Sequence, residues 1–145
     1  GLPIGGKFTI GAAYDTIWEQ WLDVAGGRGA DIACVGETFN ILGLDLDAAS
    51  TPGAAEHAID QAIARMGAVA RQHGMYVIAP VLGLIDGVVR NVALVIDRAG
   101  ECIGGYTKVH CIENEKALGV VPGEVDEAEL DAVAAGEVEI DRLDL

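Results

Sequence analysis

Apolar residues recur at helical spacing in two parts of the chain. The clearer helix covers residues 56–73, ends before Gly74, and has a stripe expected to pack in the core: Ile59, Ile63, Met66 and Ala70. An earlier helix is predicted to begin at Thr16, which has the capping-box spacing with Glu19, and to stop at Gly26-Gly27. The apolar stripe of this helix consists of Ile17, Trp18, Trp21, Leu22 and Ala25. Because its two tryptophans lie on this stripe, we interpret them as core residues rather than as a ligand cage.

Continuous apolar runs separated by turn residues predict the strands. Residues 75–84 and 88–96 form two strands joined at Asp86-Gly87, a strong hairpin signal, and a turn at 98–100 leads into a third strand over 101–108. The shorter run 32–35 is typical of a strand covered on both faces, so we interpret its Cys34 as a buried apolar residue. Strands mixed with helices in this way predict an α/β fold, with a mixed sheet and helices on one face.

The remaining segments have weaker patterns. Residues 7–10 are a short β-like run, and residues 41–53 form a loop rich in Gly, Asp and Ser. Residues 124–135 are acidic with a weak helical pattern, and Val138 and Ile140 alternate as in a strand. No internal repeat or linker is found, so residues 1–145 are expected to form part of one domain.

Composition narrows the partners and the compartment. The 145 residues are 51% hydrophobic and carry a net charge of −14, which argues against nucleic acid or an anionic membrane as a partner. Three cysteines without framework spacing favour a reducing, cytoplasmic compartment. We find no signal peptide and no apolar run of membrane-spanning length. Without an initiator Met, and with an apparent strand cut at the end, the chain is expected to be a fragment of a longer protein.

Candidate chemistry lies where the third predicted strand ends. Tyr106, Lys108 and His110 alternate and would share one face of an extended backbone, and carboxylates follow in a loop. A nearby carboxylate would keep a lysine charged, and the ammonium could stabilise an oxyanion. From these residues alone, a surface Lys–Glu pair explains the pattern better than a catalytic site. A metal site is disfavoured because the spacing matches no standard zinc site, the residues being Cys102, His110, Cys111 and Glu113.

Two stretches taken together resemble the nitrilase superfamily of carbon–nitrogen hydrolases. Residues 29–40 read Gly-Ala-Asp-Ile-Ala-Cys-Val-Gly-Glu-Thr-Phe-Asn, similar to a family motif of G-A-D, a hydrophobic run and P-E, with Gly36 where the family usually has proline. Residues 104–115 read Gly-Gly-Tyr-Thr-Lys-Val-His-Cys-Ile-Glu-Asn-Glu, similar to the motif G-x-Y-x-K-x-H with an acidic loop, and Pro122-Gly123 follows. The resemblance extends from about Thr16 to Leu145, and residues 90–100 also fit it.

The resemblance implies a fold, a reaction and a set of site residues. The fold is a four-layer α-β-β-α sandwich, of which this chain would supply roughly the first half. The reaction is hydrolysis of a small-molecule amide, carbamoyl compound or nitrile through a cysteine thioester, without a cofactor. Glu37 would be the general base, Lys108 the oxyanion-stabilising lysine, and Glu115 the second glutamate, with Glu113 as the alternative. The E-x-E loop after the lysine motif is closest to the amidase and ureidopropionase-like branches, and the full-length protein would be a homo-oligomer.

The nucleophile of that reaction is expected on a strand after Leu145, in a hydrophobic-Cys-x-Asp motif. Cys111 lies beside the lysine motif, but the family usually has a large apolar residue there, and no Cys-x-Asp pattern surrounds it. The fragment alone is therefore expected to be inactive. Two alternatives remain: a non-catalytic relative that keeps the fold without the nucleophile, and an unrelated α/β ligand-binding module.

Overall fold

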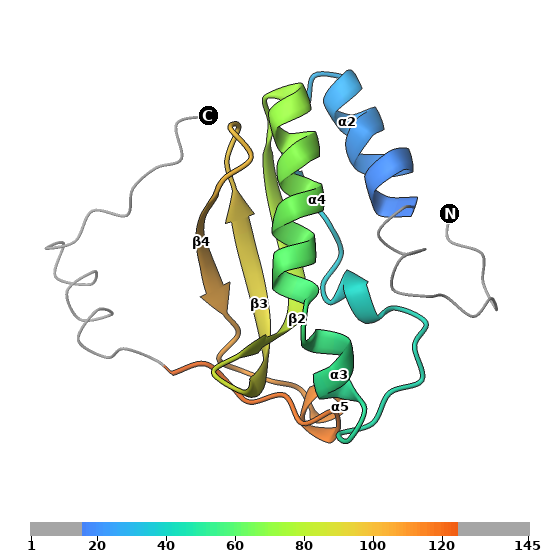
Figure 1. Cartoon of the computed structure of the whole chain (residues 1–145), viewed down its shortest axis with the longest axis vertical. Coiled ribbons are helices and arrows are strands. Elements are labelled where there is room, and N and C mark those ends of the chain that lie inside the picture. Colours follow the sequence, from blue (N-terminus) through green and yellow to red (C-terminus); the bar gives the residue numbers. More distant parts are fainter. Residues whose placement is uncertain (1–15, 125–145) are drawn as a thin grey trace, which may run out of the picture.

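The computed structural model of the protein describes residues 16–124, and its centre is a four-stranded mixed sheet (Figure 1). The strands lie in the order β1-β2-β3-β4. The short strand β1 (Ile32–Cys34) is parallel to β2 (Tyr76–Ile85), whereas β3 (Val88–Ile96) and β4 (Cys102–Thr107) continue as an antiparallel meander. The run 7–10, the pattern at Val138 and Ile140 and all of 124–135 except Glu124 lie outside the described residues.

The meander confirms the predicted strands to within one residue at each end. At the β2–β3 hairpin, Asp86 and Gly87 have φ values of 51° and 78°. Two consecutive residues in this left-handed region form the tight turn whose twist matches that of the flanking strands. The turn aligns Ile85 with Val88 and sets the pairing along the whole hairpin.

Helices cover one face of the sheet, as predicted. Helix α4 (Ala58–His73) packs along β2 and β3 and ends at Gly74, which has a φ of 63° (Figure 1). It begins two residues later than expected, because residues of the preceding loop form a separate short helix, α3 (Thr51–Ala55). The described part of the chain starts with η1 (Thr16–Leu22) and α2 (Asp23–Gly27). Two further short helices in it are η2 (Phe39–Ile41) and α5 (Glu113–Ala117).

The core lies between α4 and the covered face of β2 and β3. Met66 and Ala70 of the predicted stripe are fully buried, while Ile59 and Ile63 are partly buried at its border. Sheet residues that alternate toward the helix complete this core: Val77, Ala79, Val81, Val92, Leu94 and Ile96.

The structure corrects two burial predictions. Trp21 is 53% exposed, although Ile17 and Leu22 of the same predicted stripe are buried. Trp21 therefore faces solvent from η1, which is wound as a π-helix. Cys34 is exposed rather than buried, since it alternates with Ala33, which packs on the core, and no described helix covers the opposite face of the sheet.

Candidate active site

Glu37 lies in a loop that is anchored at both ends to β2. On one side, the Val35 N–H donates to the carbonyl of Ile78. On the other, the side chain of Asn40 forms two 3.0 Å hydrogen bonds with the backbone N–H and C=O of Leu82. Asn40 thus pairs with β2 where β1 has already ended, and it holds the loop that carries Glu37 against the sheet.

Lys108 follows β4 directly, and its backbone is held by two neighbours. Its N–H donates to the carbonyl of Asn91 in β3 at 2.8 Å, and its C=O accepts from the N–H of Gly123 at 2.9 Å. The side-chain Nζ lies 2.8 Å from Oε1 of Glu37 and 2.9 Å from Oε2 of Glu115. The structure therefore brings together the three residues predicted as catalytic.

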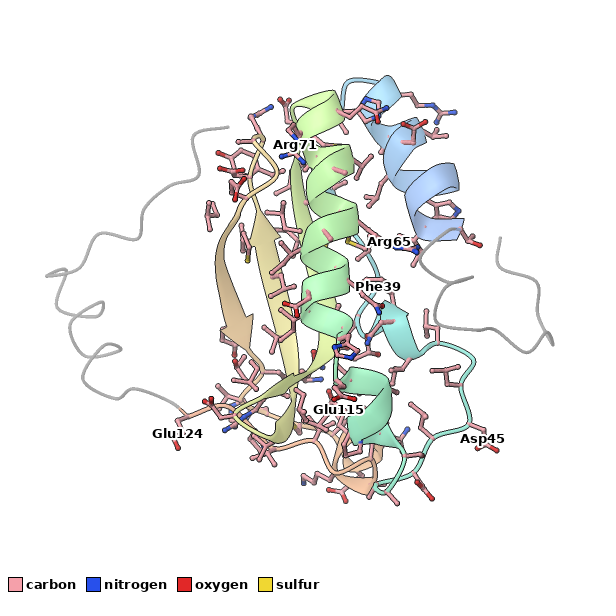
Figure 2. The ribbon with its side chains drawn as sticks, viewed as in Figure 1. Phe39, Asp45, Arg65, Arg71, Glu115 and Glu124 are labelled. Atoms are coloured by element: carbon pink, nitrogen blue, oxygen red, sulfur yellow. The ribbon has the colours of Figure 1, made fainter. Side chains whose placement is uncertain are left out.

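Glu115 belongs to α5 and is the better placed of the two candidate glutamates. It is 7% exposed, and its Oε2 also accepts the backbone N–H of Ile112 at 2.8 Å, which caps the helix. Figure 2 shows Glu115 at the lower end of the sheet, where β4 finishes. Glu113 instead forms an exposed ion pair with Lys116 and takes no part in the cluster.

Asn91 is a fourth member of the cluster that the sequence analysis missed. Its Nδ2 donates to Oε1 of Glu37 at 2.9 Å and to Oε1 of Glu115 at 2.5 Å. The residue lies in β3 and is 4% exposed. An asparagine within the mostly apolar strand β3 is the available signal, because a buried amide is retained where it has partners.

These contacts keep all three ionisable groups charged. Hydrogen bonds from Lys108 and then Asn91 lower the pKa of Glu37. Burial acts to raise the pKa of Glu115, but hydrogen bonds from Asn91, the Ile112 N–H and Lys108 outweigh it, so the net shift is downward. The two carboxylates raise the pKa of Lys108. The arrangement is an ammonium held between two carboxylates, one of which, Glu37, is 57% exposed at its side chain.

None of the three cysteines is suited to be a nucleophile at this cluster. Cys111 is closest in sequence, but burial and then the charge of Glu115 raise the pKa of its thiol, which disfavours the thiolate. Cys102 lies at the start of β4, the far end from Lys108, and Cys34 lies on the uncovered face of β1. Within residues 16–124, no group of three or more His, Cys, Asp or Glu side chains could hold a metal ion. In the same range, no helix is long and apolar enough to cross a membrane.

Solved structures share this fold. The NitFhit protein of C. elegans has a TM-score of 0.68 at 16% identity, over 79% of this chain and 30% of that protein. An amidase from Nesterenkonia sp. has a TM-score of 0.65 at 22% identity, over 86% of this chain and 52% of the amidase. A mutant of the Nesterenkonia AN1 amidase from the nitrilase superfamily has a TM-score of 0.65 at 23% identity, over 81% of this chain and 44% of that one. The chain thus spans between about a third and a half of the length of these proteins.

Sequence comparison assigns the family. No curated protein sequence matches the chain. Residues 13–137 match the carbon-nitrogen hydrolase family, a range that contains all four residues of the cluster. The chain therefore belongs to the carbon-nitrogen hydrolase family of the nitrilase superfamily.

Proposed function

We propose that this chain supplies the base and the oxyanion-stabilising lysine of an enzyme that hydrolyses non-peptide carbon–nitrogen bonds. The observation that carries the proposal is the position of Lys108 Nζ, which lies within 2.9 Å of both Glu37 and Glu115. The substrates are small amides, carbamoyl compounds or nitriles. Catalysis proceeds through a cysteine thioester.

For an amide substrate, Glu37 transfers the proton and Lys108 stabilises the negative charge that forms. Glu37 takes the proton of a thiol, whose sulfur then forms a bond to the carbonyl carbon. The carbonyl oxygen becomes an oxyanion, which the Lys108 ammonium stabilises. Glu37 returns its proton to the nitrogen, the carbon–nitrogen bond breaks, and ammonia or an amine leaves. Water then hydrolyses the thioester, with Glu37 again as the base.

Glu115 keeps Lys108 in position during these steps. It is nearly buried, and its Oε2 is fixed by the Ile112 N–H, so it is a rigid partner for the ammonium. A mobile lysine would lose its alignment with the oxyanion and would contribute less to the rate. Removal of one such donor commonly costs on the order of 100- to 1,000-fold in rate.

The thiol is proposed to come from a cysteine beyond the three in this chain. The position of each of the three, described above, argues against it as the nucleophile. A structural neighbour supports a cysteine at such a site, because one structure of a mutant of the Nesterenkonia sp. AN1 amidase shows Michael addition of acrylamide at its active-site cysteine. A segment after Leu145 with a hydrophobic-Cys-x-Asp strand would provide the same group here.

Release of ammonia from a panel of small amides, carbamoyl amines and nitriles tests the proposal. We expect no turnover by the 145-residue chain, and turnover by a version that continues past Leu145. That turnover should be lost in Glu37→Gln and in Lys108→Ala. Lys116→Ala is the matched control, because it removes a lysine that pairs with a glutamate outside the cluster, and its activity should be unchanged.

Two outcomes would overturn the proposal. Turnover by the 145-residue chain that vanishes in Cys111→Ala would make Cys111 the nucleophile. No turnover by a folded, longer version would favour a non-catalytic relative that keeps the fold.

A further inference from the structure

Four side chains form a closed ring in which donors and acceptors alternate. Lys108 donates to Glu37 and to Glu115, and Asn91 donates to the same two carboxylates. The four donor–acceptor distances lie between 2.5 and 2.9 Å. Two like charges are therefore separated by one charged and one neutral donor.

The orientation of the Asn91 amide follows from its neighbours. Ionised carboxylates only accept hydrogen bonds, so the NH2 group of the amide, and not its carbonyl, must face them. One of the two N–H bonds goes to each carboxylate. The backbone of Asn91 is fixed by its pairing with Leu82 in β2, and its carbonyl accepts the N–H of Lys108. The amide thus has little freedom to turn away.

The two carboxylate oxygens of Glu37 have different hydrogen-bond partners. Oε1 accepts from both Lys108 and Asn91, whereas Oε2 has no donor among the described residues. The glutamate side chain is 57% exposed, so a substrate or a thiol could reach this second oxygen. The oxygen that is held and the oxygen that is available are therefore distinct.

We propose that Asn91 is a positioning residue of this site, whose side-chain amide anchors Oε1 of Glu37 and thereby leaves Oε2 to take the proton of the thiol and pass it to the leaving nitrogen. The inference rests on the proposed function for the identity of that proton. Its structural part, the anchoring of Glu37 and Glu115 by one neutral amide, stands on the contacts alone.

A neutral donor suits this place for an electrostatic reason. The charged groups that face Glu37 are Lys108 after β4 and Glu115 in α5. Glu115 disfavours ionisation of Glu37, and a hydrogen bond to the charged form of a carboxylate favours it. A second cation would instead compete with Lys108 for the carboxylates. The amide adds a donor without altering the net charge of the cluster.

Carboxyl-carbon NMR titration of the 145-residue chain tests the anchoring without any catalysis. In Asn91→Leu, which keeps the approximate volume and removes the donors, the pKa values of Glu37 and Glu115 should both rise. Asn91→Ser retains a single O–H donor and should give a smaller rise, and it replaces the leucine variant if that variant does not fold. Asn114→Ala is the matched control, because it removes an exposed asparagine next to Glu115 and should leave both pKa values unchanged. Unchanged values in the folded Asn91 variants would overturn the inference.

Kinetics of the longer, active version test the positioning. Asn91→Leu should lower kcat on the order of 100-fold with little change in KM, because the base is misplaced while binding is retained. The acid limb of the kcat/KM profile should move to higher pH, an effect that loss of packing alone would not produce. If the wild-type longer version is inactive, the proposed function fails while the NMR titration still decides the anchoring. If it is active and Asn91→Leu leaves kcat and the acid limb unchanged, the inference fails and the proposed function stands.

Discussion

The buried side chain of Asn40 holds one end of the loop that carries Glu37, and the variant Asn40→Ala should measure its contribution to stability. Asn40 and Leu82 are each 1% exposed. The two hydrogen bonds between them, both 3.0 Å long, satisfy the N–H and C=O of Leu82 on the side where β1 no longer pairs. Truncation of Asn40 therefore leaves two buried backbone groups without partners.

The expected loss of unfolding free energy in Asn40→Ala follows from these two backbone groups. A buried polar group that loses its partner costs about 1–3 kcal/mol, so the two together cost about 2–6 kcal/mol. The lower half of that range applies if water enters the space that the side chain leaves. Asn40→Asp should also be destabilised, because the carboxylate still accepts from the Leu82 N–H but cannot donate to its C=O, and a charge is buried at neutral pH.

Urea-induced unfolding, followed by circular dichroism at constant pH, measures these free energies. Asn114→Ala serves as the control, since that asparagine is exposed and its removal should change the free energy of unfolding by less than about 0.5 kcal/mol. A cost below about 1 kcal/mol for Asn40→Ala would show that the loop is not held to β2 by this side chain. The account of how Glu37 is positioned would then be wrong.

Three further predictions concern packing and pH. Met66→Ala should lower the free energy of unfolding, measured in urea, by about 2–5 kcal/mol, because Met66 is fully buried. Ile63→Ala should lower it by less, because Ile63 is only partly buried. Equal losses for the two variants would contradict this description of the core. Gly67→Ala should cost about 1–3 kcal/mol, because a Cβ would collide with a backbone carbonyl of the β3–β4 turn. Gly53→Ala meets no atom within 4 Å and should instead be neutral or stabilising, so similar values for the two glycines would refute the close approach. The pKa of Glu115 is lowered in the folded state, so its contribution to stability is complete at pH values above its ordinary pKa of 4.5 and is lost as the pH falls through the lower folded pKa. Glu115→Gln should therefore reduce the dependence of the free energy of unfolding on pH in the acid range. An unchanged dependence on pH would argue against the lowered pKa.

The sequence was sufficient for the parts of the fold that depend on local patterns. The hairpin was predicted because Asp86-Gly87 supplies two left-handed residues between apolar runs, and the bounds of β3 agree to the residue. Helix α4 is predictable because its stripe, from Ile59 to Ala70, repeats over about three turns and Gly74 ends the helix. Both features need only neighbouring residues to form.

Two predictions of burial, for Trp21 and for Cys34, are wrong. Trp21 lies four residues after Ile17 on the predicted stripe, yet it is exposed while Ile17 is buried. Cys34 was expected to be buried on the assumption that both faces of its strand are covered. Neither exposure has a signal in the neighbouring residues, because the cover of a helix and of a sheet depends on what packs around them.

The cluster itself could be predicted only in part, because its members come from four separate places in the fold. Glu37 and Lys108 are 71 residues apart, and a family motif rather than any local rule linked them. Asn91 lies 54 residues from Glu37 and 24 residues from Glu115 along the chain. The pairing of β3 with its neighbours brings the amide of Asn91 into contact with both carboxylates. Glu115 has two roles, since one carboxylate caps α5 through the Ile112 N–H and also holds Lys108. A change that loosens the first turn of α5 should therefore also release the lysine, which couples the local stability of this helix to the geometry of the site.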